Sequence, residues 1–194
     1  MTERDEAIVL ATTKQKISLL SRSKGRIDAL FFLKPETAAV RPGSLISYYC
    51  SYNSYGWLVL QESSVEHVPL DWARKDIDFL HYILEFCYFF IPLGADESEI
   101  FGVIKQLYTN FYLFETQLHK KVLLCIFLAH LGLYPDDETI RLEVGKVLEI
   151  PIDKITTIDL QLIVEDTLEQ WIAWSIFAYP HGKWLKAMPL LLKK

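Results

Sequence analysis

The stretch that decides the fold is Tyr55–Ile91, YGWLVLQESSVEHVPLDWARKDIDFLHYILEFCYFFI, because the pattern of apolar residues changes at Pro69. Before Pro69, the apolar runs are short and separated by turn residues, as in β-strands. After Pro69, apolar residues recur at helical spacing over long segments without strand-like alternation. The sequence therefore predicts a sheet-built first part and a helical second part.

Toward the N-terminus, the short apolar runs predict five strands. Gly25 can take the positive φ of a tight turn, and Asn53-Ser54 predicts a hairpin turn. Five short strands connected mostly by hairpins fit a small barrel of the OB type over residues 1–68. An SH3-like barrel has the same strand count, and periodicity does not separate the two. The predicted strands are Glu6–Thr12, Gln15–Arg22, Arg26–Leu33, Ser44–Tyr52 and Tyr55–Glu62.

Toward the C-terminus, helical periodicity and capping residues predict an all-helical domain over residues 69–194. The overall fold class is then α+β. The predicted helices run from Asp71 or Asp76 to about Ile91, from Asp96 through Leu118, from Lys120 to Leu131, from Asp137 to Leu148 and from Asp159 to Ala178.

Composition limits the classes of partner. The chain has 194 residues and a net charge of -5, which disfavours bulk nucleic-acid binding. Residues 1–70 carry eight Lys/Arg against seven Asp/Glu, which leaves room for a local basic patch there. The longest apolar stretch, Phe79–Leu93, is interrupted by His81 and Glu85 and is too short to span a bilayer. With a charged N-terminus unlike a signal peptide, the sequence predicts a soluble cytoplasmic protein.

The sequence gives only weak evidence for catalytic or metal-binding groups. Cys50, Cys87 and Cys125 lie far apart in apolar runs, which argues against a disulfide framework and a zinc site. The pairs His81/Glu85 and Glu115/His119 each share a helix face but lack the repeated spacing of a di-iron centre. HExxH, GxSxG and phosphate-binding loop motifs do not occur. We expect a protein that is not an enzyme and needs no cofactor.

Basic and aromatic residues of the barrel suggest a nucleic-acid platform. Arg22, Lys24 and Arg26 lie on one predicted turn, so their cations are expected to project together at the barrel rim, with Lys14 and Lys16 nearby. Single-strand binders combine such cations with exposed aromatic rings. The alternative is a solvated turn beside a core of aromatic residues. The aromatic residues in question are Tyr48, Tyr49, Tyr52, Tyr55 and Trp57.

A second basic cluster, His119-Lys120-Lys121, opens the predicted central helix. Cations at a helix N-terminus oppose the macrodipole, at a cost of about a few tenths of a kcal/mol each. The cluster either receives an anionic partner or simply extends its lysines into water above the core. The sequence leaves both open.

Several short stretches follow one another in an order that is typical of a known family. They are Ala7-Ile-Val-Leu10, Ser21-Arg-Ser-Lys-Gly-Arg-Ile27, Val40-Arg-Pro-Gly-Ser-Leu-Ile46, Phe79-Leu-His-Tyr-Ile-Leu-Glu85, His119-Lys-Lys121 and His130-Leu-Gly-Leu-Tyr134. In this order they resemble the bacterial recombination mediator family RecO, and the similarity covers most of residues 6–135 and the closing segment His181–Leu192. The family's basic segment after the third strand is reduced here to Phe31–Glu36, and Pro135–Pro151 contains no cysteines, so no zinc site is expected.

This resemblance implies a non-enzymatic mediator of recombinational DNA repair. RecO proteins bind single- and double-stranded DNA, anneal strands, and work with RecR to load RecA. Their helical domain receives the acidic tail of single-strand-binding protein, here expected at Lys120 and Lys121. We expect DNA contacts at the cations of the barrel, which are Lys14, Lys16, Arg22, Lys24, Arg26, Lys34 and Arg41.

Two other functions fit the sequence. The chain is either a protein–protein adaptor that has lost DNA binding or a small hydrolase or metal enzyme with a pocket at the barrel rim. Because affinity for DNA grows with the number of phosphates neutralised, the reduced basic segment predicts weak binding to single-stranded DNA.

Overall fold

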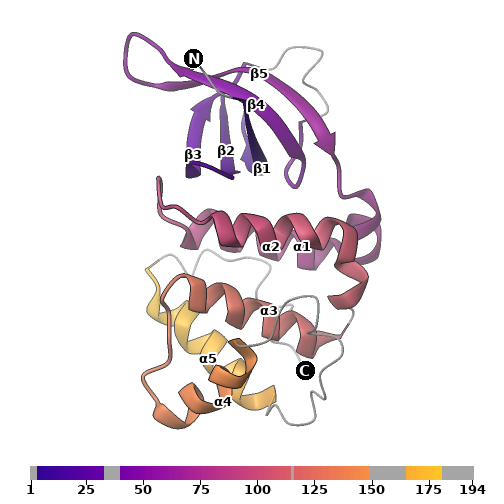
Figure 1. Cartoon of the computed structure of the whole chain (residues 1–194), viewed down its shortest axis with the longest axis vertical. Coiled ribbons are helices and arrows are strands. Elements are labelled where there is room, and N and C mark those ends of the chain that lie inside the picture. Colours follow the sequence, from indigo (N-terminus) through magenta and orange to yellow (C-terminus); the bar gives the residue numbers. More distant parts are fainter. Residues whose placement is uncertain (1–3, 33–39, 115, 149–164, 181–194) are drawn as a thin grey trace. The chain divides into compact units, whose positions relative to one another are not determined.

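The structure is a computed structural model that describes residues 4–32, 40–114, 116–148 and 165–180 (Figure 1). Lys34, Glu115, Asp159 and the closing segment His181–Leu192 lie outside these described residues. Over the parts that are described, no helix combines the length and apolar character that a membrane span requires.

Residues 5–67 form a closed five-stranded barrel with the strand order β1-β2-β3-β5-β4 (Figure 1). Pairing of β1 with β4 closes it, β3 and β5 are parallel, and all other pairs are antiparallel. A five-stranded barrel followed by helices is thus confirmed, and it is consistent with an OB-like fold. The strands are β1 (Asp5–Thr12), β2 (Lys16–Ser21), β3 (Gly25–Leu30), β4 (Leu45–Tyr52) and β5 (Leu58–His67).

The fifth strand differs most from its prediction. It begins at Leu58 rather than Tyr55 and continues to His67 rather than Glu62. The difference arises because the turn after β4 includes more residues than Asn53-Ser54. Asn53 accepts hydrogen bonds at its side-chain oxygen from the backbone N–H groups of Tyr55 and Trp57, at 3.0 Å and 2.9 Å. These two residues therefore belong to the turn.

The barrel interior follows the two-residue alternation of strands. On β1, Ala7 and Val9 point into the core, together with Ile17 and Leu19 of β2. The intervening Ile8 is also fully buried, and α1 packs against β1. Because β1 is covered on both faces, its outer surface is closed to large ligands.

The first helix, α1 (Leu70–Phe90), begins directly after Pro69 and bends at Asp76, whose φ is -152° and ψ is 75°. The Asp76 carboxylate accepts a hydrogen bond from the backbone N–H of Phe79 at 3.0 Å. Asp76 therefore caps the second part of α1, as one of the two predicted caps, while Asp71 lies in the first turn. Beyond this cap, α1 buries aromatic rings, and those of Phe86 and Phe90 stack with centroids 4.6 Å apart.

The second predicted helix ends earlier than expected. Helix α2 (Ser98–Asn110) gives way to the 3-10 helix η2 (Phe111–Phe114) instead of continuing to Leu118. Thr116 then starts α3 (Gln117–His130), because its side chain accepts a hydrogen bond from the backbone N–H of His119. A Thr cap within the apolar stripe separates two helices that periodicity alone joins.

After η2, the described residues form three α-helices: α3, α4 (Glu138–Leu148) and α5 (Glu165–Ala178). Asp137 caps α4 as predicted, accepting from the backbone N–H of Thr139 at 2.8 Å. Helix α3 packs against both α4 and α5. It is apolar nearly all round, and its central residues Val122–Leu128 are buried, as expected for the central helix of this domain.

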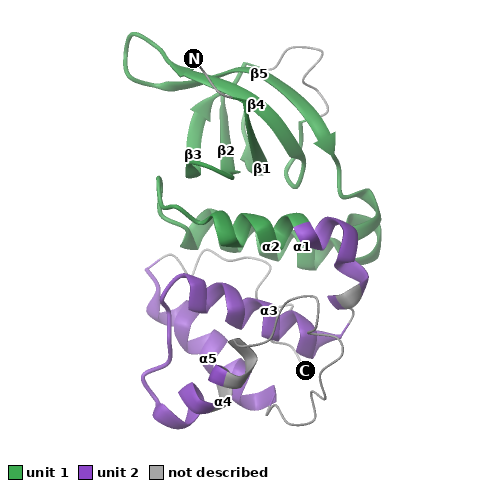
Figure 2. Ribbon diagram, in the orientation of Figure 1, with its two compact units in different colours: residues 1–105 green, residues 106–194 purple. Residues whose placement is uncertain are grey.

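The chain divides into two compact units, residues 1–105 and 106–194 (Figure 2). The sheet itself ends at His67. The first unit continues through α1 and into α2. Within it, the Lys105 ammonium of α2 pairs with the Glu6 carboxylate of β1 at 2.8 Å. Helix α1 and the start of α2 thus belong with the barrel.

Candidate nucleic-acid interface

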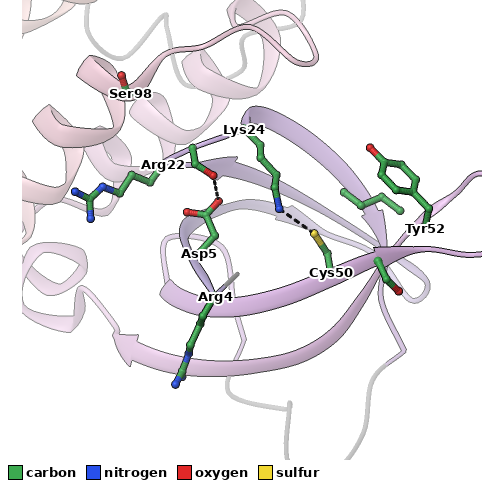
Figure 3. A pocket seen from close by; sticks show the side chains of 10 residues that line it. Arg4, Asp5, Arg22, Lys24, Cys50, Tyr52 and Ser98 are labelled. Carbon is green, nitrogen blue, oxygen red and sulfur yellow. Dashed lines mark hydrogen bonds between the residues drawn. The ribbon is translucent and has the colours of Figure 1, made fainter. Parts of the chain in front are cut away.

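A pocket of about 810 Å³ opens beside the β2–β3 turn (Figure 3). Its wall includes Cys50 and Leu58, two residues that also contact the barrel core. This volume lies within the range of small-molecule sites, about 300–1,000 Å³. Residues of the N-terminus, the β2–β3 turn and the β4–β5 hairpin converge on it, among them Arg4, Asp5, Arg22, Lys24 and Tyr52.

Lys24 is the predicted cation that reaches into this pocket. Its ammonium donates a hydrogen bond to the Cys50 sulfur at 3.3 Å and lies 5.6 Å from the centroid of the Tyr48 ring (Figure 3). Both of these groups are uncharged partners. Among the described residues, none forms a salt bridge with Lys24. Its positive charge is therefore available to an anionic ligand.

Asp5 supplies the opposite charge in the pocket wall. Its carboxylate accepts hydrogen bonds from the hydroxyls of Ser21 at 2.5 Å and Ser23 at 2.6 Å, and from the backbone N–H of Glu6. The Tyr48 hydroxyl is a fourth donor, at 3.2 Å. Burial raises the pKa of Asp5, but these hydrogen bonds outweigh it and hold the pKa below its usual value. Asp5 is thus ionised at neutral pH and oriented by the turn.

Arg22 also lines the pocket but points away from Lys24 (Figure 3). Its guanidinium lies 3.5 Å from the Glu6 carboxylate, which Lys105 contacts from α2. Arg22 is two-thirds exposed, so this pair is weak. A phosphate can therefore compete with Glu6 for the Arg22 guanidinium.

Arg26 does not join Arg22 and Lys24 at the rim, contrary to the prediction. Its guanidinium donates to the backbone carbonyl of Ile91 at 2.9 Å and lies over the Tyr88 ring, 4.6 Å from the centroid. Strand alternation explains the difference, because Arg26 pairs with Leu20 on the helix-facing side of the sheet. Arg26 attaches the barrel to α1.

The remaining predicted cations are dispersed. Lys16 forms a 2.7 Å salt bridge with Asp28 of β3, and Lys14 is exposed on the β1–β2 loop. Burial raises the pKa of Asp28, but hydrogen bonds from Lys16 and Ser18 outweigh this effect and hold the pKa below its usual value. Arg41 is exposed just before β4, at the opposite end of that strand from Tyr52. The structure therefore does not gather the six predicted cations that it describes into one groove.

The aromatic residues divide into two groups that periodicity could not separate. Tyr48 is buried in the barrel, whereas Tyr52, Tyr55 and Trp57 are exposed by 75%, 84% and 64%. These three residues form the tip of the β4–β5 hairpin. The turn signal at Asn53 was visible in the sequence, but the exposure of the residues after it depends on where β5 begins.

Lys120 and Lys121 are buried rather than extended into water. The Lys121 ammonium contacts the carboxylates of Glu165 and Glu169, one turn apart on α5. Burial lowers the pKa of Lys121, but the two carboxylates outweigh this effect and hold the pKa above its usual value. The positive charge expected to receive an acidic tail is thus matched within the second unit.

The structure gives no support for a metal site at the two His/Glu pairs, His81/Glu85 and Glu115/His119. His81 is exposed on α1, and Glu115 lies outside the described residues. Within those that are described, no three His, Cys, Asp or Glu side chains converge as a metal site needs.

No protein-family model matches the chain, and no curated protein is significantly similar to it.

Proposed function

We propose that this protein is a RecO-like, non-enzymatic mediator of recombinational DNA repair that binds single-stranded DNA at its barrel. The observation that carries the proposal is the pocket shared by Lys24 and the exposed aromatic hairpin. Tyr52 lines this pocket and also belongs to the hairpin. A cation beside exposed rings is the combination that single strands require.

The first test is binding of a labelled oligothymidine, followed by fluorescence anisotropy at several salt concentrations. Lys24→Gln removes a charge without a salt-bridge partner among the described residues, so binding should weaken and the salt dependence should flatten. On single strands, the slope of log K against log salt should fall by about 0.7 per lost phosphate contact.

Arg74→Gln is the matched control, since this α1 side chain is 80% exposed. It removes the same charge at a residue that does not line the pocket. An equal effect of both variants would mean that only the overall charge matters and that the pocket is not the binding site.

The proposal also includes two protein partners, which are RecR and the acidic tail of single-strand-binding protein. A tail that docks at Lys120 and Lys121 has to displace Glu165 and Glu169 from Lys121. Titration with a tail peptide tests this part separately from DNA binding.

The second candidate is a protein–protein adaptor without DNA binding. Trp174 and Phe177 favour it, because they are three residues apart on α5 and are exposed by 45% and 83%. Retained RecR binding without any binding of oligothymidine at low salt would replace the mediator function with this one.

A further inference from the structure

The β4–β5 hairpin presents aromatic rings with little else around them. We propose that unpaired nucleobases stack on Tyr55 and Trp57, and that this stacking rather than phosphate contact supplies most of the affinity for single strands. The inference rests on the proposed function and specifies how the site works. On this inference, the protein recognises unpaired bases and does not bind polyanions in general.

Hydrogen bonds order the backbone that carries the Tyr55 and Trp57 rings. Asn53 donates its N–H to the Trp57 carbonyl at 2.9 Å, and its own carbonyl accepts from Gly56 at 3.0 Å. Its side-chain oxygen accepts from both Tyr55 and Trp57. Gly56 takes the positive φ of 77° that this turn needs. Because the turn's backbone is already ordered, binding does not have to order it, which favours affinity.

Chemistry distinguishes this surface from a protein-docking face. Residues 50–61 carry no charged side chain, so the tip of the hairpin has no carboxylate that repels a polyanion. In the described part of residues 4–67, every large hydrophobic side chain that is exposed is aromatic, namely Phe32, Tyr52, Tyr55 and Trp57. The exposed large hydrophobics of the helices instead include aliphatic residues such as Ile77 and Leu142. Aromatic faces without aliphatic neighbours suit bases, which stack regardless of sequence.

The barrel cations explain why phosphates contribute less. Lys16 is paired with Asp28, Arg22 with Glu6, and Arg26 is held by Ile91 and Tyr88. Near the hairpin, this leaves Lys24 and the weakly paired Arg22 at the pocket and Lys14 on the β1–β2 loop, while Arg4 contacts Glu66. Lys16 pairs with Leu30, Leu30 with Val59 and Val59 with Ser51, so one row of strand pairs leads from that loop to the hairpin. One to three phosphate contacts give a slope of about -0.7 to -2.1.

An abasic oligonucleotide tests the inference directly. The 194-residue protein's binding of an oligothymidine of about 12 nucleotides, within the usual site size, is compared with its binding of an abasic strand of equal length. The abasic strand keeps every phosphate and lacks every base. We expect it to bind at least about tenfold more weakly, and both strands to show shallow salt dependence.

Variants locate the effect. Tyr55→Ala and Trp57→Ala should each weaken oligothymidine binding about tenfold, and Trp57→Phe should retain most of it, because a ring remains. Phe177→Ala is the matched control, since Phe177 is 83% exposed and Tyr55 is 84% exposed. It should leave DNA binding unchanged. Thermal unfolding confirms that each variant is folded.

The outcomes separate the two proposals. If the abasic strand binds within about twofold of oligothymidine, or the hairpin variants bind normally, stacking is refuted while DNA binding stands. If hairpin variants lose RecR but keep DNA, the surface is a protein interface and the inference also fails. If oligothymidine does not bind at any salt concentration, the proposed function and the inference fail together.

Discussion

Gly25 occupies a position where no other residue fits. Its φ is +64°, and a Cβ added there would lie 1.5 Å from the backbone oxygen of Ala95. That loop cannot easily withdraw, because Gly94 donates its N–H to the Arg26 carbonyl at 2.8 Å. The sequence predicted the positive φ. The approach of the loop, seventy residues later in the chain, could not be predicted from local pattern.

Gly25→Ala should therefore destabilise the protein by about 3 kcal/mol or more, combining backbone strain with overpacking. Gly56→Ala is the control, since Gly56 has φ +77° and no atom within 4 Å of the added Cβ. It should cost only about 1 kcal/mol of backbone strain. The free energy of unfolding in urea measures both, and equal losses would show that the Ala95 contact is unimportant.

Asp5 couples the pocket to pH. Its pKa is lower in the folded protein than the unfolded value of 3.8. Its contribution to stability is therefore present above pH 3.8 and is lost as the pH falls through the folded-state pKa. Asp5→Asn should destabilise the protein at neutral pH, and the difference from the natural chain should shrink in acid.

The difference in unfolding free energy, measured across the acid range, checks this. Ser23→Ala removes one of the four donors to Asp5 and should show a smaller change with the same pH dependence. A difference that stays constant into strong acid would contradict the role of ionised Asp5.

At the scale of elements, capping residues were the reliable guides. Asp76 and Asp137 cap helices where the sequence placed them. Periodicity was less reliable wherever an apolar pattern crosses a turn. It extended the second helix through Leu118, although Thr116 starts a new helix there, and it placed Tyr55 and Trp57 in a strand although Asn53 holds them in a turn.

The α3–α5 pair contains a charge cluster that the sequence could not reveal. Lys121 and its partners Glu165 and Glu169 are far apart in the chain, and only packing of the helices brings them together. The one signal was the four-residue spacing of the two glutamates, which places them on one helix face.

Lys121→Met should destabilise the protein by about 2 kcal/mol, because two carboxylates are left together beside an apolar side chain. Their partial exposure keeps the cost below that of a fully buried charge. Adding Glu165→Gln and Glu169→Gln should recover much of the loss. Chemical unfolding of the single and triple variants measures this, and equal stabilities would show that the charges do not interact.

At the scale of the whole molecule, the change of pattern at Pro69 predicted the order of barrel and helices. The grouping of α1 and the start of α2 with the barrel was not predictable, because it depends on contacts between distant residues. Arg26 reaches Ile91, and Glu6 reaches Lys105. The contact of Arg26 removes one of the predicted DNA-binding cations from an open surface, so the site is smaller than the sequence suggested.

The bridge between Arg26 and Leu93 has a consequence for solubility. Among the described residues, β3 pairs with β5 only at Leu30, which leaves most of that side of β3 without a strand neighbour. An open strand edge can pair with a strand of another chain, which leads to aggregation. Leu93 and Gly94 occupy this edge at Arg26, so the linker between two helices also shields the barrel from self-association.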